Sequence, residues 1–214
     1  MNSQCKIIIF DMDGVVLDSE PLHEIARQMM YEKYGIIPDD SFPDPVGKSA
    51  RGFWQIVGEK YNRTWNNYDM EEEQFRLVAE QVENHDVPPT KGLIPVIEWA
   101  KERGIKIGLA SSSARMLVDR VLAALDIKKY FDVVVSGDEV ENKKPAPDLY
   151  EKVLRLAGFT PEEAVAVEDS TTGVGAAKNA GIYCHGYRNE TSGEQDLSKA
   201  DKVIESLTEL MDKR

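Results

Sequence analysis

The chain has 214 residues, enough to bury the core of one large domain or of a core domain with a small insertion. Its net charge of −12 argues against nucleic acid or an anionic membrane as a partner, because both require a basic face. The two cysteines, Cys5 and Cys184, indicate neither a disulfide framework nor a zinc site, and no apolar secretory segment precedes Ile7. We therefore expect a cytoplasmic protein, and the sequence is compatible with a monomer without fixing the oligomeric state.

Apolar runs alternate with amphipathic runs along most of the chain. The predicted buried strands span residues 7–10, 105–110, 133–136, 164–167 and 182–185, and the predicted helices span 95–103, 115–125, 148–157 and 174–180. Strands that are hydrophobic on both faces and alternate with helices predict a Rossmann-like α/β fold, a parallel sheet flanked by helices. Ligands of such sheets bind at the carboxyl ends of the strands.

The alternation is interrupted between the first two predicted strands. Helical patterning covers residues 22–34, 50–61 and 70–84, with no convincing strand between them. We interpret residues 18–89 as an inserted all-helical cap domain, and residues 1–17 and 90–214 as the α/β core domain. Pro88 and Pro89 at the end of the insertion are equally consistent with the simple end of a helix.

Asp11 and Asp13 directly follow the first predicted strand, and Gly14 then permits a sharp turn. Residues two apart on an extended segment point the same way, so both carboxylates can face one site. A calcium loop starting at Asp11 is excluded, because Val16 and Leu22 stand where glycine and glutamate are required. A solvated turn and a catalytic pair both remain open, and a receiver-type phosphate acceptor would not explain the helical insertion.

Three serines, residues 111–113, follow the second predicted strand and precede a helix. Hydroxyls and free backbone N–H groups at the start of a helix can bind an anion. We predict that Ser111, at the strand end, contacts a phosphate. Ser112 and Ser113 are more simply explained as helix N-caps, and Ser112 is also counted as a candidate substrate contact.

Two further polar clusters follow the third and fourth predicted strands. Lys143 and Lys144 precede a stiff Pro-Ala-Pro segment that could fix an ammonium group beside a phosphate or a carboxylate, and the residues alone do not decide between the two lysines. Glu168 and Asp169 end a buried strand, where two acids are costly unless they are paired or bind a metal. Carboxylate oxygens suit Mg²⁺. An acidic first helical turn would explain one of these acids but not both.

These clusters, in this order, resemble the haloacid dehalogenase superfamily, specifically its phosphatase and β-phosphoglucomutase-like branch with a small helical cap. The resemblance covers essentially the whole chain. It is carried by DMDGVVLDSE at 11–20, Ser111, KPAPD at 144–148, and VEDS at 167–170 followed by Gly173.

The resemblance implies a role for each matching residue. Asp11 would be the nucleophile that accepts the phosphoryl group, and Asp13 would be the general acid and base. Ser111 would hold a phosphate oxygen, and Lys144, rather than Lys143, would pair with Asp11 and the phosphate. Mg²⁺ would be bound by Asp11, the backbone carbonyl of Asp13 and Asp169, with assistance from Glu168.

Asp13 has to carry a proton during the first step of such a reaction. We therefore expect either that the pKa of Asp13 is raised or that a closed cap retains its proton.

Substrate choice is expected to reside in the inserted segment. Glu20 and His23 match positions near the substrate in sugar phosphatases and β-phosphoglucomutases, although a lone histidine is more often a packing or surface residue. Arg51, with Lys48 behind it, lies in a stretch that resembles the substrate-specificity loop of the family, although Ser49 could simply begin a helix. Arg76 is the remaining candidate, as the one basic residue of the third cap helix.

The sequence is therefore compatible with three functions. The first is a phosphatase that hydrolyses a small phosphorylated metabolite, such as a sugar phosphate. The second is a β-phosphoglucomutase-type hexose-phosphate mutase, which ranks lower because the third cap helix lacks the lysine that the mutase pattern favours. The third is a non-catalytic phosphate-binding protein, which the intact acids and Lys144 argue against.

Overall fold

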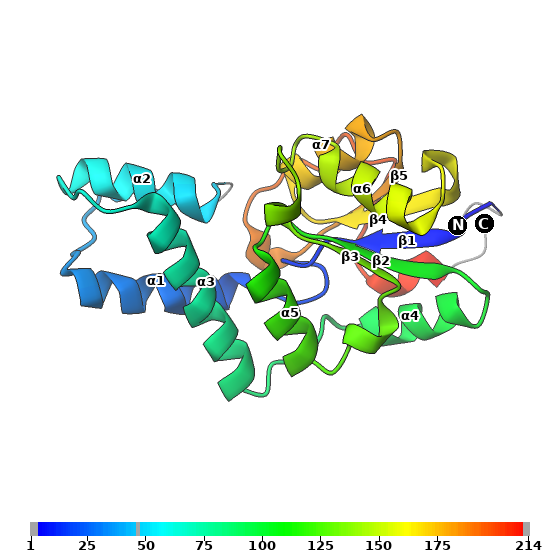
Figure 1. Cartoon of the computed structure of the whole chain (residues 1–214), viewed down its shortest axis with the longest axis horizontal. Coiled ribbons are helices and arrows are strands. Elements are labelled where there is room, and N and C mark those ends of the chain that lie inside the picture. Colours follow the sequence, from blue (N-terminus) through cyan, green and yellow to red (C-terminus); the bar gives the residue numbers. More distant parts are fainter. Residues whose placement is uncertain (1–3, 46–47, 212–214) are drawn as a thin grey trace.

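The protein is an α/β structure built on one six-stranded sheet, and the computed structural model describes residues 4–45 and 48–211 (Figure 1). All paired strands are parallel, in the order β3-β2-β1-β4-β5-β6. The strands are β1 (Ile7–Phe10), β2 (Lys106–Ala110), β3 (Val133–Val135), β4 (Ala164–Glu168), β5 (Tyr183–Tyr187) and β6 (Lys202–Ile204). The helices are α1 (Glu20–Tyr34), α2 (Ala50–Lys60), α3 (Asn67–Asn84), α4 (Leu93–Lys101), α5 (Arg115–Ala124), α6 (Asp148–Ala157) and α7 (Thr171–Asn179).

Strand β1 shows why the sheet is covered on both faces. All four of its residues are fully buried, and alternate side chains point to opposite faces. Ile7 and Ile9 pack with residues of α6 and α7, whereas Ile8 and Phe10 pack with residues of α4 and α5. The predicted parallel α/β fold is therefore confirmed.

The structure also contains a strand that the sequence pattern did not predict. Strand β6 has only three residues and adds to the sheet beside β5, with Ile204 buried and Val203 exposed. Three residues are too few to show an alternation of apolar and polar side chains, and the sequence pattern therefore does not reveal this strand.

Several helices begin earlier than hydrophobic periodicity predicts, because polar residues form their first turns. Helix α3 begins at Asn67, where the side chain of Asn66 accepts a hydrogen bond from the N–H of Tyr68. Helix α7 begins at Thr171 and is capped by Ser170, whose hydroxyl accepts from the N–H of Gly173. Such caps satisfy backbone donors that a helix leaves free at its start.

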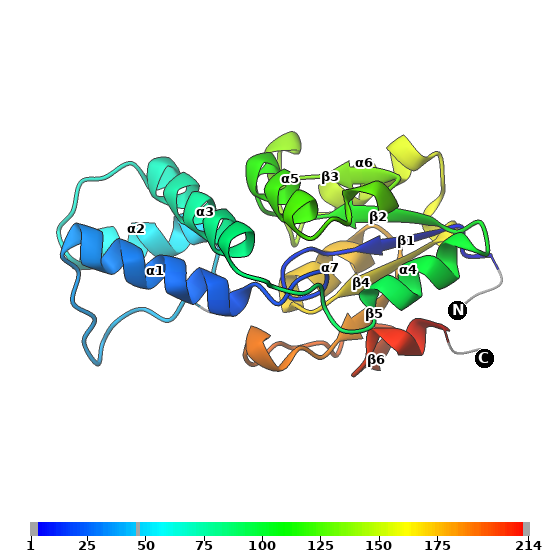
Figure 2. The same cartoon turned by 90° about the horizontal axis from the view of Figure 1, so that it is seen from below.

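Helices α1, α2 and α3 lie between β1 and β2 in the chain and gather at one end of the molecule, beyond the carboxyl ends of the strands (Figures 1 and 2). Their interior is aromatic, with Trp54 fully buried and edge-on to Tyr31 and Trp65. The Trp54 indole N–H donates to Gln74 Oε1 at 2.7 Å. The division at residues 18 and 89 into two domains stays a prediction.

Helix α3 also packs against the core helix α5. An ion pair joins them, in which Arg120 Nε donates to Glu83 Oε1 at 2.6 Å. Helix α3 is therefore the part of the insertion that contacts a helix of the α/β core. Among the residues that the structure describes, no helix is long and apolar enough to cross a membrane.

Candidate active site

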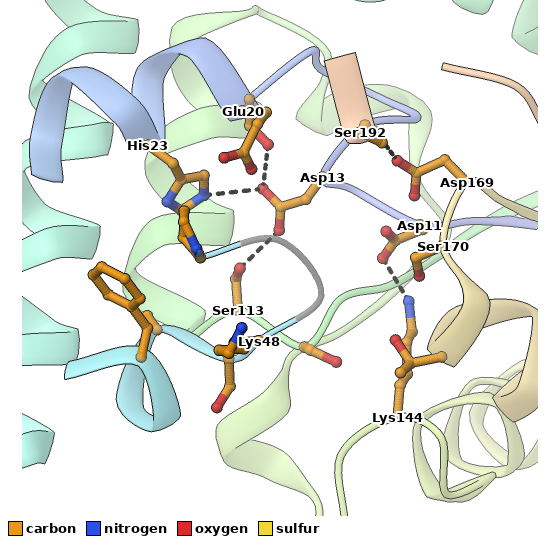
Figure 3. Close-up of a pocket in the computed structure, with 18 of the residues that line it drawn as sticks. Asp11, Asp13, Glu20, His23, Lys48, Ser113, Lys144, Asp169, Ser170 and Ser192 are labelled. Carbon is orange, nitrogen blue, oxygen red and sulfur yellow. Dashed lines mark hydrogen bonds and ion pairs between the residues drawn. The ribbon is translucent and has the colours of Figure 1, made fainter. Parts of the chain in front are cut away.

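A cavity of about 630 Å³ lies between the carboxyl edge of the sheet and the helical insertion (Figure 3). The sheet side contributes polar residues that follow β1, β2, β3 and β4, because parallel strands bring their carboxyl ends to one edge. They include Asp11, Asp13, Ser112, Ser113, Lys143, Lys144 and Asp169. The predicted meeting of the four polar clusters therefore exists in the structure.

Asp11 and Lys144 form an ion pair at the base of this cavity. The Lys144 ammonium donates to Asp11 Oδ1 at 2.5 Å and to the carbonyl oxygen of Ala110 at 2.8 Å, and lies 2.6 Å from Glu168 Oε1. Burial alone would lower the pKa of Lys144, but the two carboxylates raise it above its ordinary value. Lys144 therefore remains a cation beside Asp11.

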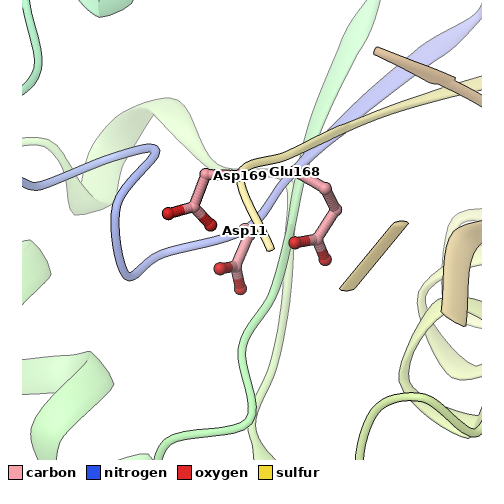
Figure 4. Close-up of side chains that lie close together, drawn as sticks. All are labelled: Asp11, Glu168 and Asp169. Atoms are coloured by element: carbon pink, nitrogen blue, oxygen red, sulfur yellow. The ribbon is translucent and has the colours of Figure 1, made fainter. Parts of the chain in front are cut away.

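Asp11, Glu168 and Asp169 form a buried carboxylate cluster whose ligand oxygens lie within 4.8 Å of one another (Figure 4). Burial raises the pKa of each of the three acids, and mutual repulsion with Asp11 raises those of Glu168 and Asp169 further. Glu168 Oε2 is buried and has no hydrogen-bond partner among the described residues. One lysine thus balances three carboxylates, and this under-neutralised oxygen-rich set fits a hard divalent cation.

The cluster is held in place from both sides. Tyr150 donates to Glu168 Oε1 at 2.5 Å, and the hydroxyl of Ser192 donates to Asp169 Oδ2. Gly173 in α7 passes so close that a Cβ there would lie 1.8 Å from Glu168 Oε2. Glycine at this position therefore makes room for the carboxylate.

We expect Gly173→Ala to destabilise the protein by about 1–3 kcal/mol, because the new methyl group would displace a fully buried carboxylate. Urea unfolding measures this change. The matched control is Gly175→Ala on the same helix, whose Cβ would meet only Pro145 at 3.5 Å. That control should be stabilised by about 0.5–1 kcal/mol through helix propensity. Equal stabilities of the two variants would contradict the close approach.

The side chain of Asp13 turns away from the carboxylate cluster, toward the helical insertion (Figure 3). Ser19 donates to its Oδ1 at 2.7 Å and Ser113 donates to its Oδ2 at 2.8 Å, while His23 Nε2 lies 3.7 Å from Oδ1. Burial would raise the pKa of Asp13, but His23 and the two hydroxyls outweigh it and lower the pKa.

The expectation of a raised pKa at Asp13 is therefore wrong. The reason is that hydrogen-bond donors surround the carboxylate and stabilise its charged form. Retention of a proton by a closed cap, and a role of the Asp13 backbone carbonyl toward a metal, stay predictions.

The three serines differ from their predicted roles in one respect. Neither Ser112 nor Ser113 caps the following helix, because Ala114 occupies the N-cap position and the carboxylate of Asp138 accepts from the N–H of Arg115. Ser113 instead donates to Asp13, and Ser112 lines the cavity. Ser111 is fully buried and its hydroxyl accepts from the N–H of Ser113, so its contact with a phosphate stays a prediction.

Three of the predicted substrate contacts from the insertion line the cavity, namely Glu20, His23 and Lys48. Glu20 accepts from Arg27 at 2.6 Å, and His23 Nδ1 lies 3.0 Å from the amide nitrogen of Gln74. The Lys48 ammonium donates to the carbonyl oxygen of Asp44 at 2.5 Å.

Arg51 and Arg76 are not among the residues that line the cavity. Arg51 pairs with Glu71 and stacks on Tyr68, with its Cζ 3.7 Å from the ring centre. Arg76 pairs with Glu80, one turn further along α3. Ser49 caps α2, which bears out the alternative explanation for this stretch.

Several residues around the cavity were not assigned a role in the site from the sequence, and Ser113 was expected only as a helix N-cap. Ser19 and Ser113 hold Asp13, Ser192 holds Asp169, and Glu71 and Gln74 face the cavity from α3. Ser19 and Ser113 each lie within six residues of a predicted site residue, so proximity in sequence could have indicated them. Nothing local marks Ser192 or Glu71, because the fold alone brings them to the site.

The fold is α/β, and it places a cluster of buried carboxylates at the carboxyl edge of a parallel sheet. The family model for haloacid dehalogenase-like hydrolases matches residues 8–187, and the chain belongs to this family.

Among curated relatives, the chain is 37% identical over 182 residues to a phosphorylated carbohydrates phosphatase of Thermotoga maritima, covering 83% of this chain and 82% of the relative. It is 32% identical over 215 residues to hexitol phosphatase B of Escherichia coli K12, covering 97% and 95%. CbbY from Rhodobacter sphaeroides, solved in complex with phosphate, is similar over 96% of both chains, with a TM-score of 0.81 and 26% identity. A mutant of CbbY has been solved with xylulose 1,5-bisphosphate.

Proposed function

We propose that this hydrolase is a Mg²⁺-dependent phosphatase that cleaves a small phosphorylated sugar through an aspartyl-phosphate intermediate. The observation that carries the proposal is the position of Asp11, paired with Lys144 at the base of a cavity into which Asp13 also points. A carboxylate nucleophile and a second carboxyl group for proton transfer are the two groups that such a reaction requires.

In the first step, an Asp11 carboxylate oxygen attacks the phosphorus atom while the bond to the leaving oxygen breaks. Asp13 gives a proton to that oxygen, and the sugar departs as a neutral alcohol. In the second step, Asp13 takes a proton from a water molecule that attacks the phosphoryl group, which releases inorganic phosphate and regenerates Asp11. Lys144 neutralises charge on the phosphoryl oxygens throughout, and this kind of stabilisation supplies most of the catalysis in phosphoryl transfer.

Asp11 and Asp169 would hold the Mg²⁺, with Glu168 assisting, since these carboxylates form the buried cluster. When bound, Mg²⁺ would offset their charge and that of the phosphate. Ser192 and Tyr150 would keep the ligands in place through their hydrogen bonds to Asp169 and Glu168.

A sugar phosphate as substrate is supported by the two curated relatives, which are named as phosphatases of phosphorylated carbohydrates and of hexitols. A cavity of about 630 Å³ accommodates a molecule of that size. Hydroxyl groups of the sugar would meet Glu20, His23 and Gln74, which face the cavity from α1 and α3.

One observation favours a second candidate, a β-phosphoglucomutase-type mutase. His23 lies 3.7 Å from Asp13, where it could help Asp13 to activate a sugar hydroxyl instead of water. We rank hydrolysis first, because α3 presents Glu71 and Gln74 to the cavity and no lysine.

The proposal is tested by incubating the protein with Mg²⁺ and a panel of sugar phosphates, and by following free phosphate and glucose 6-phosphate in parallel. The panel includes β-glucose 1-phosphate with a trace of glucose 1,6-bisphosphate. Phosphate release that is lost in the Asp11→Asn variant supports the phosphatase. Primer-dependent glucose 6-phosphate without matching phosphate release would instead identify a mutase.

Removal of divalent metal with EDTA is expected to lower phosphatase activity by about 10²-fold or more, because one lysine cannot balance three carboxylates and a phosphate. Adding Mg²⁺ back should restore the activity. Thermal unfolding with and without Mg²⁺ provides an independent readout, since a ligand bound to the folded state raises the unfolding temperature. Full activity in EDTA would contradict the metal requirement.

A further inference from the structure

The basic and acidic side chains that line the outer part of the cavity are equal in number. Outside the Asp11, Asp13, Lys144 and Asp169 group, the described lining contains three basic side chains of lysine or arginine and three acidic side chains. They are Arg27, Lys48 and Lys143, and Glu20, Glu71 and Glu194. The outer cavity therefore offers no surplus positive charge to a second anionic group of a substrate.

Glu71 is the acid whose position matters most for this balance. It projects from α3 and is only 7% exposed, although it reaches the cavity wall. Its Oε2 accepts from the Arg51 guanidinium, and its Oε1 lies 3.8 Å from the Lys143 ammonium. Glu71 thus engages both the arginine of the insertion and the lysine of the core that could otherwise bind a phosphate.

Arg51 is held away from the cavity by a second contact as well. Its guanidinium stacks on the ring of Tyr68, one turn before Glu71 on α3. Stacking and a charge-assisted hydrogen bond together give an arginine a fixed position. Recruiting Arg51 to a ligand would break this arrangement and leave the buried Glu71 carboxylate with less compensation, which is costly.

We propose that Glu71 is a specificity-determining residue that makes the site select sugar monophosphates and discriminate against bisphosphates. The inference rests on the proposed phosphatase function. Glu71 withholds Arg51 and Lys143 from a second phosphate and adds a repelling carboxylate at the same place. A neutral polyhydroxylated leaving group meets no such repulsion, and its hydroxyls can donate to the carboxylates of Glu71 and Glu20.

The first test compares glucose 6-phosphate with glucose 1,6-bisphosphate, and fructose 6-phosphate with fructose 1,6-bisphosphate, on the wild-type protein with Mg²⁺. The members of each pair differ only by the second phosphate group. We expect kcat/KM for phosphate release to be higher for the monophosphate by about tenfold or more, because like charges across a binding site are strongly disfavoured. Equal or better use of the bisphosphates would overturn the proposal.

The second test replaces Glu71 with glutamine, which keeps the shape and removes the charge. We expect the preference for monophosphate over bisphosphate to fall by about tenfold, because Arg51 and Lys143 become free to bind the second phosphate. The matched control is Glu73→Gln, on the same helix and also ion-paired, through Lys33, but outside the cavity lining. An unchanged preference in Glu71→Gln, or the same change in Glu73→Gln, would overturn the proposal.

Two further measurements keep the proposal testable if Glu71→Gln folds poorly or if turnover is slow. Arg51→Gln removes a cation from Glu71 and should increase the preference for monophosphates. Calorimetric titration of the Asp11→Asn protein with each pair measures the preference as a ratio of dissociation constants, without turnover. Failure of the phosphatase function would appear differently, as no phosphate release from any monophosphate or from 4-nitrophenyl phosphate.

Discussion

Replacing Asp11 with asparagine is expected to lower kcat/KM for every phosphorylated substrate by about 10⁴-fold or more, because removal of a covalent nucleophile eliminates the reaction path itself. An amide oxygen is a poor nucleophile and carries no charge to pair with Lys144. Phosphate release under saturating Mg²⁺ measures the loss, and intact-mass spectrometry after an acid quench tests for a phosphoryl group on the protein.

The fold should survive this substitution. Asp11 repels Glu168 and Asp169 within the buried cluster, and Lys144 retains Glu168 as a partner when the Asp11 charge is removed. We therefore expect the thermal unfolding temperature to stay the same or to rise. Asp18→Asn is the matched control, a nearby aspartate on the same segment that bonds to Thr191 outside the cavity. Residual activity of Asp11→Asn above one percent, with an intact fold, would contradict the assignment of the nucleophile.

Replacing Asp13 with asparagine is expected to lower kcat for sugar phosphates by about 10²–10⁴-fold, the usual range for loss of general acid–base catalysis. The amide cannot give a proton to the departing sugar or accept one from water. Ser19 and Ser113 each donate to one carboxylate oxygen of Asp13. In the asparagine variant one of these oxygens becomes an NH₂ group, which is a donor, so we expect the serine hydroxyl facing it to reorient and accept. Steady-state rates on a sugar monophosphate measure the effect.

The same variant separates the two steps of the reaction. 4-Nitrophenyl phosphate has a leaving group that needs no proton, so Asp13→Asn should still form the aspartyl phosphate from this substrate while its hydrolysis is slow. Quenched samples should then show protein with one added phosphoryl group, located at Asp11 by peptide mapping. A variant that neither accumulates this species nor loses activity would contradict the role of Asp13.

The predictions for Asp11→Asn and Asp13→Asn differ because the two aspartates, although only two residues apart, have different surroundings. Asp11 lies among buried acids and a lysine, and its pKa is raised mainly by burial. Asp13 lies among hydroxyls and His23 beneath the helical insertion, and its pKa is lowered by them. In the structure as described, Asp13 is therefore better suited to accept a proton than to give one. The first step then requires that the bound substrate or closure of the insertion raise the pKa of Asp13. A pH–rate profile measures that pKa during the reaction.

Much of the molecule could be predicted from local patterns. Buried apolar runs identified five of the six strands, β1 to β5, because these strands are rich in apolar residues. Polar residues at their carboxyl ends indicated Asp11, Lys144, Glu168 and Asp169, because parallel strands converge at one edge. Strand β6 was missed because three residues, one of them exposed, carry no period.

The sequence by itself determined the parallel α/β fold, the helical insertion and the order of the four polar clusters, because each depends on residues adjacent along the chain. Only the tertiary structure decided how those groups are paired. Ser192 reaches Asp169 and Ser113 reaches Asp13 across 23 and 100 residues of chain. Glu71 pairs with Arg51 in the same way. Ion pairing depends on distance in space, and no local pattern in the sequence indicates which partner the folded chain brings near.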